Sequence, residues 1–238
     1  MPAPSKASAP APTPGAPRPS TAVSRPPSDP TQSASTRLTF DLAATIRHDG
    51  HGGVADDLDT PEGLTAWVRD HAELLPDALA ARRYRADAAA LEGVRALRAA
   101  VRALFAHAVL PGEPSPADAR RLLPLAEAVA RLNDAAAKVP TVPVLSWPGG
   151  TGPLVRDEPV PGAGDGTSAR RADLLGAALA RAAHAFLAGP DRQRLRACHA
   201  PRCVRYFLKE HPRQEWCRPS CGNRARVARH HERARGSA

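Results

Sequence analysis

Apolar positions through the middle of the chain recur every three or four residues, which is the spacing of amphipathic helices. The clearest run carries apolar side chains at Leu91, Val94, Leu97, Val101, Leu104 and Phe105. Runs of this kind predict four helices, over about 60–76, 86–110, 115–138 and 168–187. Thr60 before Pro61, and Ser115 before Pro116, each place a capping side chain ahead of a proline in the first turn. The pattern therefore predicts a mainly α-helical N-terminal domain.

Several polar residues lie on or beside these stripes. Arg95, Arg98 and Arg102 lie off the apolar stripe of the longest helix, so we expect them on its solvated face. Asn133 sits against the stripe of the next helix, and we expect it to be a buried hydrogen-bonding group.

The segments around these helices are shorter or irregular. Residues 38–42 fit a short strand or a first helical turn. The stretch over 48–57 contains five potential metal ligands, His48, Asp49, His51, Asp56 and Asp57. Its three glycines and its lack of helical spacing favour a solvated loop over a metal site. β-Branched residues on either side of a glycine-rich turn predict a two-stranded hairpin, roughly 142–147 and 153–157.

The first 36 residues differ in composition from the rest of the chain. They contain ten prolines and no aromatic residue, so they cannot bury enough apolar surface to offset the entropy of ordering. We expect a disordered tail over 1–36, a folded domain over 37–190 and a small module over 191–238. No stretch approaches the ~18 apolar residues of a membrane helix, and the N-terminus lacks the apolar segment of a secretory signal. A cytoplasmic protein without membrane contact is therefore expected.

The excess positive charge is confined to the last module. The chain has a formal net charge of +9. Residues 191–238 contain 13 Lys and Arg against 4 Asp and Glu, an excess of nine, whereas the 20 basic and 20 acidic residues of 1–190 cancel. A basic patch in one small module is typical of proteins that bind polyanions, although a solvated basic tail without a specific partner has the same composition.

All four cysteines lie in the same module, as two close pairs. Four residues separate Cys198 from Cys203, thirteen lie between the pairs, and three separate Cys217 from Cys221. Two short loops that each present two thiolates suit tetrahedral zinc. In a reducing compartment, clustered cysteines favour metal ligands over disulfides. We therefore predict one structural Zn²⁺ held by these four cysteines.

The other residues of this module indicate what it binds. His199 and His211 are not expected to bind the metal, because four thiolates already complete a tetrahedron. Trp216 is expected to pack over the site, and Val227 to anchor a basic helix that follows Cys221. The candidates for nucleic-acid contact are Asn223, Arg224, Arg226, Arg229 and Arg233, together with Arg213. For Arg224 a phosphate contact and a structural bond inside the metal knuckle are both open, and Asn223 also fits a turn or helix cap.

The motif Cys221-Gly222-Asn223-Arg224, with Trp216-Cys217 just before it and Cys198 and Cys203 upstream, resembles the CGNR zinc-finger family. In that family the finger follows a larger N-terminal domain called ABATE. Residues 60–67, Leu97-Arg98 and Leu132-Asn133 are similar to that domain, so the resemblance covers about 37–235. It implies a stress-linked transcriptional regulator of bacteria, with a treble-clef-like or knuckle-type finger that ends in a basic helix.

Two positions depart from the pattern of the family. Ala44 stands where the family usually has the Asn of an Asn-Thr pair, and residues 209–213 replace an Asp-x-Ser-Arg loop. That loop is a plausible nucleic-acid contact in the family, so its replacement bears on the contact and leaves the zinc site intact.

Three functions are consistent with these features. The first is a nucleoid-associated transcriptional regulator that binds double-stranded DNA through the finger, while the helical domain senses a small molecule or forms a homodimer. The second is an RNA- or ribosome-associated binding protein, and the third is a redox sensor that loses zinc when its thiolates are oxidised. An enzyme is not expected, because a site closed by four thiolates leaves no position for substrate or water.

Overall fold

The computed structural model describes residues 33–49, 53–118, 122–147, 150, 152–160 and 168–236. The described residues from Ser33 onward belong to one compact unit. The expected disordered tail over 1–36 lies outside the described residues except for its last four. Those four are the cap and the first three residues of the first helix, so the folded part begins earlier than the composition predicts.

Helix α1 (Ala34–Ala43) occupies the segment that the sequence leaves open between strand and helix. Ser33 caps it, because its hydroxyl accepts a hydrogen bond from the backbone N–H of Thr36 at 3.1 Å. Leu38 and Leu42 are buried on the side of the helix that faces the core.

Two short antiparallel strands follow, β1 (Ile46–His48) and β2 (Val54–Asp56). The expectation of a solvated loop over 48–57 is therefore wrong at its two ends, because His48 belongs to β1 and residues 54–56 form β2. His51 lies outside the described residues. Asp56, in β2, has a partner 42 residues away in helix α3, which local spacing does not reveal.

Helix α2 (Pro61–Asp70) begins where the sequence predicts. The hydroxyl of Thr60 accepts a hydrogen bond from the backbone N–H of Gly63 at 3.1 Å, and Pro61 fills the first helical position. The helix ends six residues before the predicted end. Three single turns of 3-10 helix take over, namely η1 (Ala72–Leu74), η2 (Asp77–Leu79) and η3 (Ala81–Arg83).

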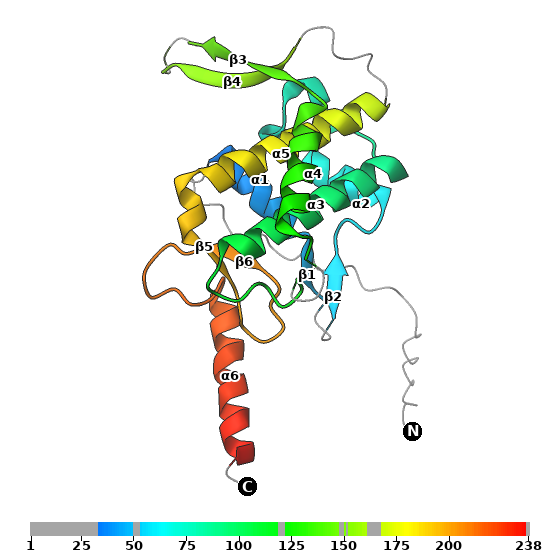
Figure 1. The fold of residues 1–238 in the computed structure, drawn as a ribbon. Coiled ribbons are helices and arrows are strands. Elements are labelled where there is room, and N and C mark those ends of the chain that lie inside the picture. Colours follow the sequence, from blue (N-terminus) through cyan, green and yellow to red (C-terminus); the bar gives the residue numbers. More distant parts are fainter. Residues whose placement is uncertain are drawn as a thin grey trace, which may run out of the picture. The chain divides into compact units, whose positions relative to one another are not determined.

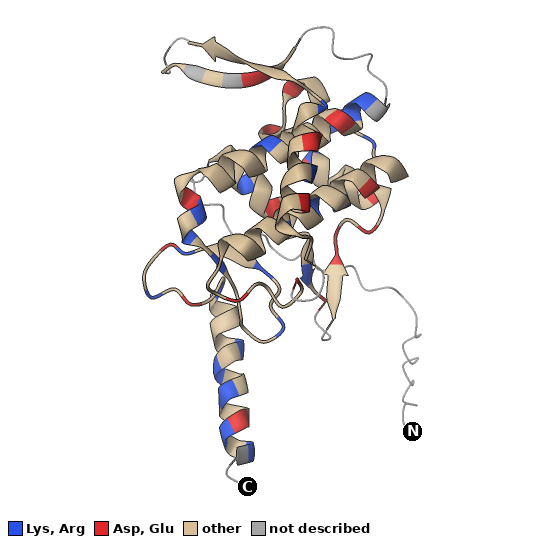
Figure 2. Ribbon diagram, viewed as in Figure 1, with Lys and Arg blue, Asp and Glu red and all other residues tan. Residues whose placement is uncertain are grey.

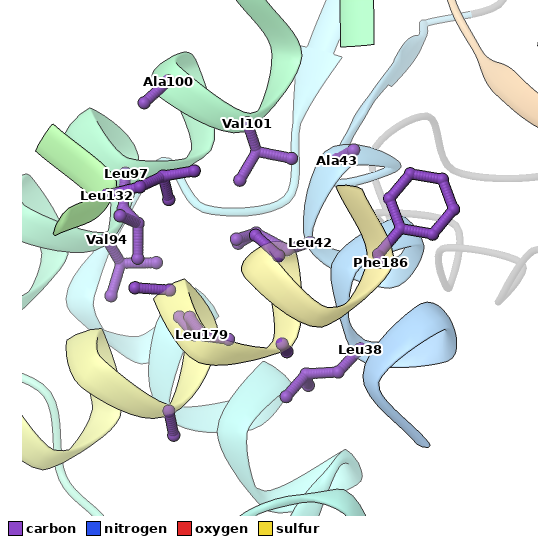
Figure 3. Close-up of a cluster of buried hydrophobic side chains, with 14 of the residues drawn as sticks. Leu38, Leu42, Ala43, Val94, Leu97, Ala100, Val101, Leu132, Leu179 and Phe186 are labelled. Atoms are coloured by element: carbon purple, nitrogen blue, oxygen red, sulfur yellow. The ribbon is translucent and has the colours of Figure 1, made fainter. Parts of the chain in front are cut away.

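The hydrophobic core lies among α1 and three longer helices, namely α3 (Ala88–Ala108), α4 (Leu125–Ala137) and α5 (Ser168–Ala188) (Figure 1). Figure 3 shows Leu42, Val101 and Phe186, from α1, α3 and α5, in one cluster. The rings of Phe40, Phe105 and Phe186 pack against one another with centroids 5.1 to 5.3 Å apart. The predicted helices over 86–110 and 168–187 are thus confirmed, together with the apolar stripe of the first.

Helix α4 begins at Leu125, although the sequence predicts a start near Ser115. Pro124 directly precedes the helix, where its missing N–H costs nothing. Ser115 caps no helix but is fully buried, and its backbone N–H donates to the hydroxyl of Tyr206 at 3.3 Å. A tertiary contact has therefore overridden the local capping signal.

The core-facing side of α4 is also narrower than predicted. Ala128 and Leu132 are buried, whereas Leu125 and Val129 of the predicted stripe are more than 40% exposed. Asn133 is exposed, so the expectation of a buried hydrogen-bonding group is wrong.

The predicted hairpin is confirmed, with strands β3 (Thr141–Ser146) and β4 (Leu154–Pro159). Leu145 and Val155 lie opposite each other in the register and are 64% and 66% exposed. Trp147 is exposed as well. The hairpin, shown at the top of Figure 1, therefore presents apolar side chains to solvent.

The C-terminal segment has a 3-10 turn, two antiparallel strands and a long helix, namely η4 (Pro190–Arg194), β5 (Leu195–Ala197), β6 (Tyr206–Leu208) and α6 (Pro219–Gly236). Leu195, Tyr206 and Leu208 are buried in the same core as the helices. The mainly helical fold with a C-terminal finger that ends in a basic helix is confirmed. Among the described residues, no helix combines the length and apolar content needed to span a membrane.

Candidate metal centre and nucleic-acid interface

The four cysteines meet between the β5–β6 pair and helix α6. Cys198 directly follows β5, and Cys203 comes shortly before β6. Cys217 lies two residues before α6, and Cys221 lies in the first turn of α6. Their four sulfur atoms all lie within 4.8 Å of one another. Cys198, Cys203 and Cys221 are buried, and Cys217 is half-buried.

The spacing of the sulfurs fits a tetrahedral metal ion. Zinc–sulfur bonds of about 2.3 Å place the corners of a tetrahedron roughly 3.8 Å apart. The Cys203 and Cys217 sulfurs are 3.7 Å apart, and those of Cys217 and Cys221 are 3.5 Å apart. The donor set and its dimensions therefore suit one structural zinc, with the four ligands predicted from the sequence.

The protonation of the sulfurs also favours a cation. Hydrogen bonds from Cys203 and Cys217 lower the pKa of Cys198 well below its usual range. The same shared protons, with burial, hold the pKa values of Cys203 and Cys217 above theirs. Four packed thiols cannot all ionise without a positive charge among them, and a bound Zn²⁺ supplies that charge.

A tight turn presents the first two cysteines. The backbone N–H of Cys198 donates to the Arg205 carbonyl at 2.9 Å, and that of Cys203 donates to the Ala200 carbonyl at 2.8 Å. Arg202, at the end of the turn, has a left-handed backbone with φ of 64°. This conformation carries strain for a residue with a side chain, and the two hydrogen bonds hold it in place.

Gly222 and Trp216, two further residues of the motif, lie close to each other beside the metal site. A Cβ atom at Gly222 would lie 3.0 Å from the Cδ1 atom of Trp216, so the glycine lets the indole approach the helix closely. Trp216 packs against the cluster of buried cysteines. The predicted packing of Trp216 over the site is confirmed.

The loop over 209–213 is a hydrogen-bonded turn. The backbone N–H of Glu210 donates to the side chain of Gln214 at 2.7 Å, and the backbone N–H of Gln214 donates to the His211 carbonyl at 3.0 Å. Arg213 and His211 are exposed, and so is His199. Neither histidine joins a group of potential metal ligands in the part of the chain that the structure describes.

Arg224 and Asn223 both make contacts within the finger. The Nη2 atom of Arg224 donates to the sulfur of Cys221 at 3.0 Å. The Oδ1 atom of Asn223 accepts from Nη2 of Arg226 at 2.7 Å, and Asn223 itself is exposed. Of the two roles left open for Arg224, the structure contains the bond inside the knuckle, to the sulfur of Cys221.

The rest of α6 forms a basic surface that we call the α6 surface, made up of Arg226, Arg229, Arg233 and Arg235. All four are exposed, and Figure 2 shows basic residues along the length of the helix. The expected apolar anchor, Val227, is 56% exposed, and Ala225 is buried in its place. The helix is therefore fixed through its first turns, and exposed basic residues follow.

Arg102, for which the sequence predicts a solvated position, is buried at the junction of α3 with the finger. Its guanidinium binds both carboxylate oxygens of Asp118, at 2.8 and 2.9 Å. It also donates to the carbonyls of Ala43 and Val204, at 2.7 and 3.1 Å. The hydroxyl of Tyr206 donates to Asp118 at 2.7 Å. One charged network thus joins α1, α3 and the finger strand β6.

Arg98 is buried as well, one turn before Arg102. It binds Asp56 through two nitrogens and donates to the hydroxyl of Thr45 at 2.9 Å. Burial opposes ionisation of Asp56, but these hydrogen bonds and charges outweigh it and lower its pKa. The expectation of a solvated arginine face is confirmed for the half-exposed Arg95 only.

The fold and the site define a four-cysteine zinc-finger protein with a helical N-terminal domain. Comparison with family models agrees: residues 36–190 match ABATE, described as “Putative stress-induced transcription regulator”, and residues 194–234 match the CGNR zinc finger. The chain belongs to the ABATE family and carries the CGNR finger that the sequence motif indicates. No curated protein matches it.

Proposed function

We propose that this protein is a transcriptional regulator that binds double-stranded DNA through its zinc finger, and that it is not an enzyme. The observation that carries the proposal is the α6 surface, in which exposed arginines follow the metal site along one helix. At 1.5 Å per residue, α6 is about 27 Å long, which suits insertion in a major groove. Nucleoid association follows from the same proposal.

The electrostatics of the finger support this proposal. The whole excess of positive charge lies in residues 191–238, and Arg213 adds an exposed cation outside α6. Each arginine that neutralises a phosphate releases counterions, so binding should weaken steeply with salt.

The experiment is a salt titration of the full zinc-loaded chain with duplex DNA. Replacing Arg226, Arg229 and Arg233 by Gln should weaken binding and flatten the slope of log affinity against log salt by about 0.9 for each phosphate that is no longer neutralised. A matched control replaces three exposed arginines of the helical part, Arg82, Arg83 and Arg171. Equal effects of the two triple variants would contradict an interface on α6.

Competition by structured RNA at equal salt tests the alternative partner. Stronger binding to RNA would reject the DNA assignment and favour the RNA- or ribosome-associated protein. Release of zinc by mild peroxide would support the redox sensor instead. The homodimer and the small-molecule ligand of the helical part stay predictions.

A further inference from the structure

Arg224 points back toward the metal site although it sits among the arginines of α6. Arg224 and Cys221 are three residues apart in the helix, so their side chains share one face. The guanidinium donates to the Cys221 sulfur at 3.0 Å, and only 3% of Cys221 is exposed. A charged donor strengthens a hydrogen bond, and the burial of Cys221 limits the competition of water for its sulfur.

The net charge of the zinc–thiolate site explains why a positively charged side chain is needed beside it. Four thiolates around one Zn²⁺ carry a net charge of about −2, and burial makes an uncompensated charge costly. The half-buried Arg205 also feels the charges of Cys217, Cys203 and Cys221, although burial and Arg218 lower its pKa. Among these arginines, Arg224 is the one with a hydrogen bond to a sulfur.

The neighbouring arginine provides a built-in comparison. Arg226 lies two residues further along α6 and is exposed, as Arg224 is, but its guanidinium bonds Asn223 in place of a sulfur. Both side chains carry one positive charge in the same helix. Any effect that follows from net charge alone should therefore be shared by the two residues.

We propose that Arg224 is a positioning residue of the metal centre, which holds Cys221 as a metal-bound thiolate by donating to its sulfur. This role extends beyond nucleic-acid binding and does not depend on it. Groups that hydrogen-bond metal ligands typically change metal affinity by about 10- to 100-fold when they are removed. The same range is expected for Arg224.

The test measures zinc affinity of the full chain by competition with a chromogenic chelator, in the absence of nucleic acid. Arg224→Gln should bind zinc about 10- to 100-fold more weakly than the unmodified chain, whereas Arg226→Gln should stay within about twofold. In the Co²⁺-substituted protein, the sulfur-to-metal charge-transfer band should shift for Arg224→Gln and stay in place for Arg226→Gln. Equal zinc affinities and equal spectra for the two variants would overturn the proposal.

A second pair of variants decides the matter if Arg224→Gln fails to fold. Arg224→Lys keeps the charge but lacks the planar fork that reaches the sulfur, and Arg226→Lys is its control. We expect weaker zinc binding in the first variant only. Unchanged zinc affinity in both lysine variants would overturn the assigned contact.

Discussion

Arg102 and Asp118 form a bidentate ion pair in the interior, with Nε–Oδ1 and Nη2–Oδ2 distances of 2.8 and 2.9 Å. The same arginine binds the Val204 carbonyl next to the metal site. The pair therefore joins the helical part to the finger.

Breaking this pair from one side should be costly. Arg102→Met leaves the Asp118 carboxylate buried without its charged partner, and we expect a decrease of about 3–5 kcal/mol in the free energy of unfolding. Urea denaturation measures this decrease. The control is Arg131→Met, which removes an exposed ion pair with Glu127 and should cost less than about 1 kcal/mol. Equal costs for the two variants would contradict a structural role for the junction.

The two tyrosines should stay protonated in the folded protein above pH 10. Burial, with the nearby Asp87 carboxylate, raises the pKa of Tyr84 to about 12, and burial with Asp118 raises that of Tyr206 further. A raised pKa gives stability that is present below the unfolded value of about 10 and is lost as pH rises beyond it.

Ultraviolet absorbance of tyrosinate tests this directly, because the chain has only these two tyrosines. Little tyrosinate is expected at about pH 10.5 before unfolding, and both rings should ionise in urea. Tyr206→Phe should make stability less sensitive to pH in this range. Ordinary titration of both rings near pH 10 in the folded protein would disprove their burial.

Relief of the strained turn should stabilise the finger. Arg202 has a φ of 64°, which glycine adopts without penalty. Arg202→Gly should therefore gain roughly 1 kcal/mol in the zinc-bound state, measured as a higher thermal midpoint. Arg202→Ala removes the same charge but keeps a Cβ atom, so it should show no such gain. A gain in both variants would point to charge instead of backbone strain.

Removal of residues 191–238 should destabilise the helical part as well as abolish nucleic-acid binding. The ring of Tyr206 lies 5.3 Å from that of Phe105, and Leu195 and Leu208 belong to the common core. Truncation therefore exposes apolar surface of α3. Circular dichroism during thermal unfolding should show a lower midpoint for the truncated chain, and an unchanged midpoint would show that the core is independent of the finger.

The elements and the ligands that local spacing encodes could be predicted from the sequence. The cysteine pairs indicate the metal site, the i, i+3 and i+4 stripes indicate α3 and α5, and Thr60-Pro61 indicates the start of α2. The CGNR motif indicates the finger family as well.

The roles that depend on distant partners could not be predicted. Arg98 and Arg102 look like solvated residues, because Asp56 and Asp118 reach them only in the folded chain. Ser115 also looks like a helix cap in the sequence, because local spacing does not show its partner, Tyr206, which is 91 residues away. The i, i+3 spacing places Arg224 and Cys221 on one face of α6. The spacing alone does not show whether the Arg224 side chain turns toward the sulfur or toward solvent.

The most direct test of the role of the metal is a zinc titration of the metal-free full chain, with duplex-DNA binding as the readout. We expect binding to appear in proportion to added zinc and to saturate at one equivalent, because the metal fixes the start of α6. Cys217→Ser should show no zinc-dependent binding. Full DNA binding by the metal-free chain, or by Cys217→Ser, would contradict the claim that the four cysteines hold the basic helix in place.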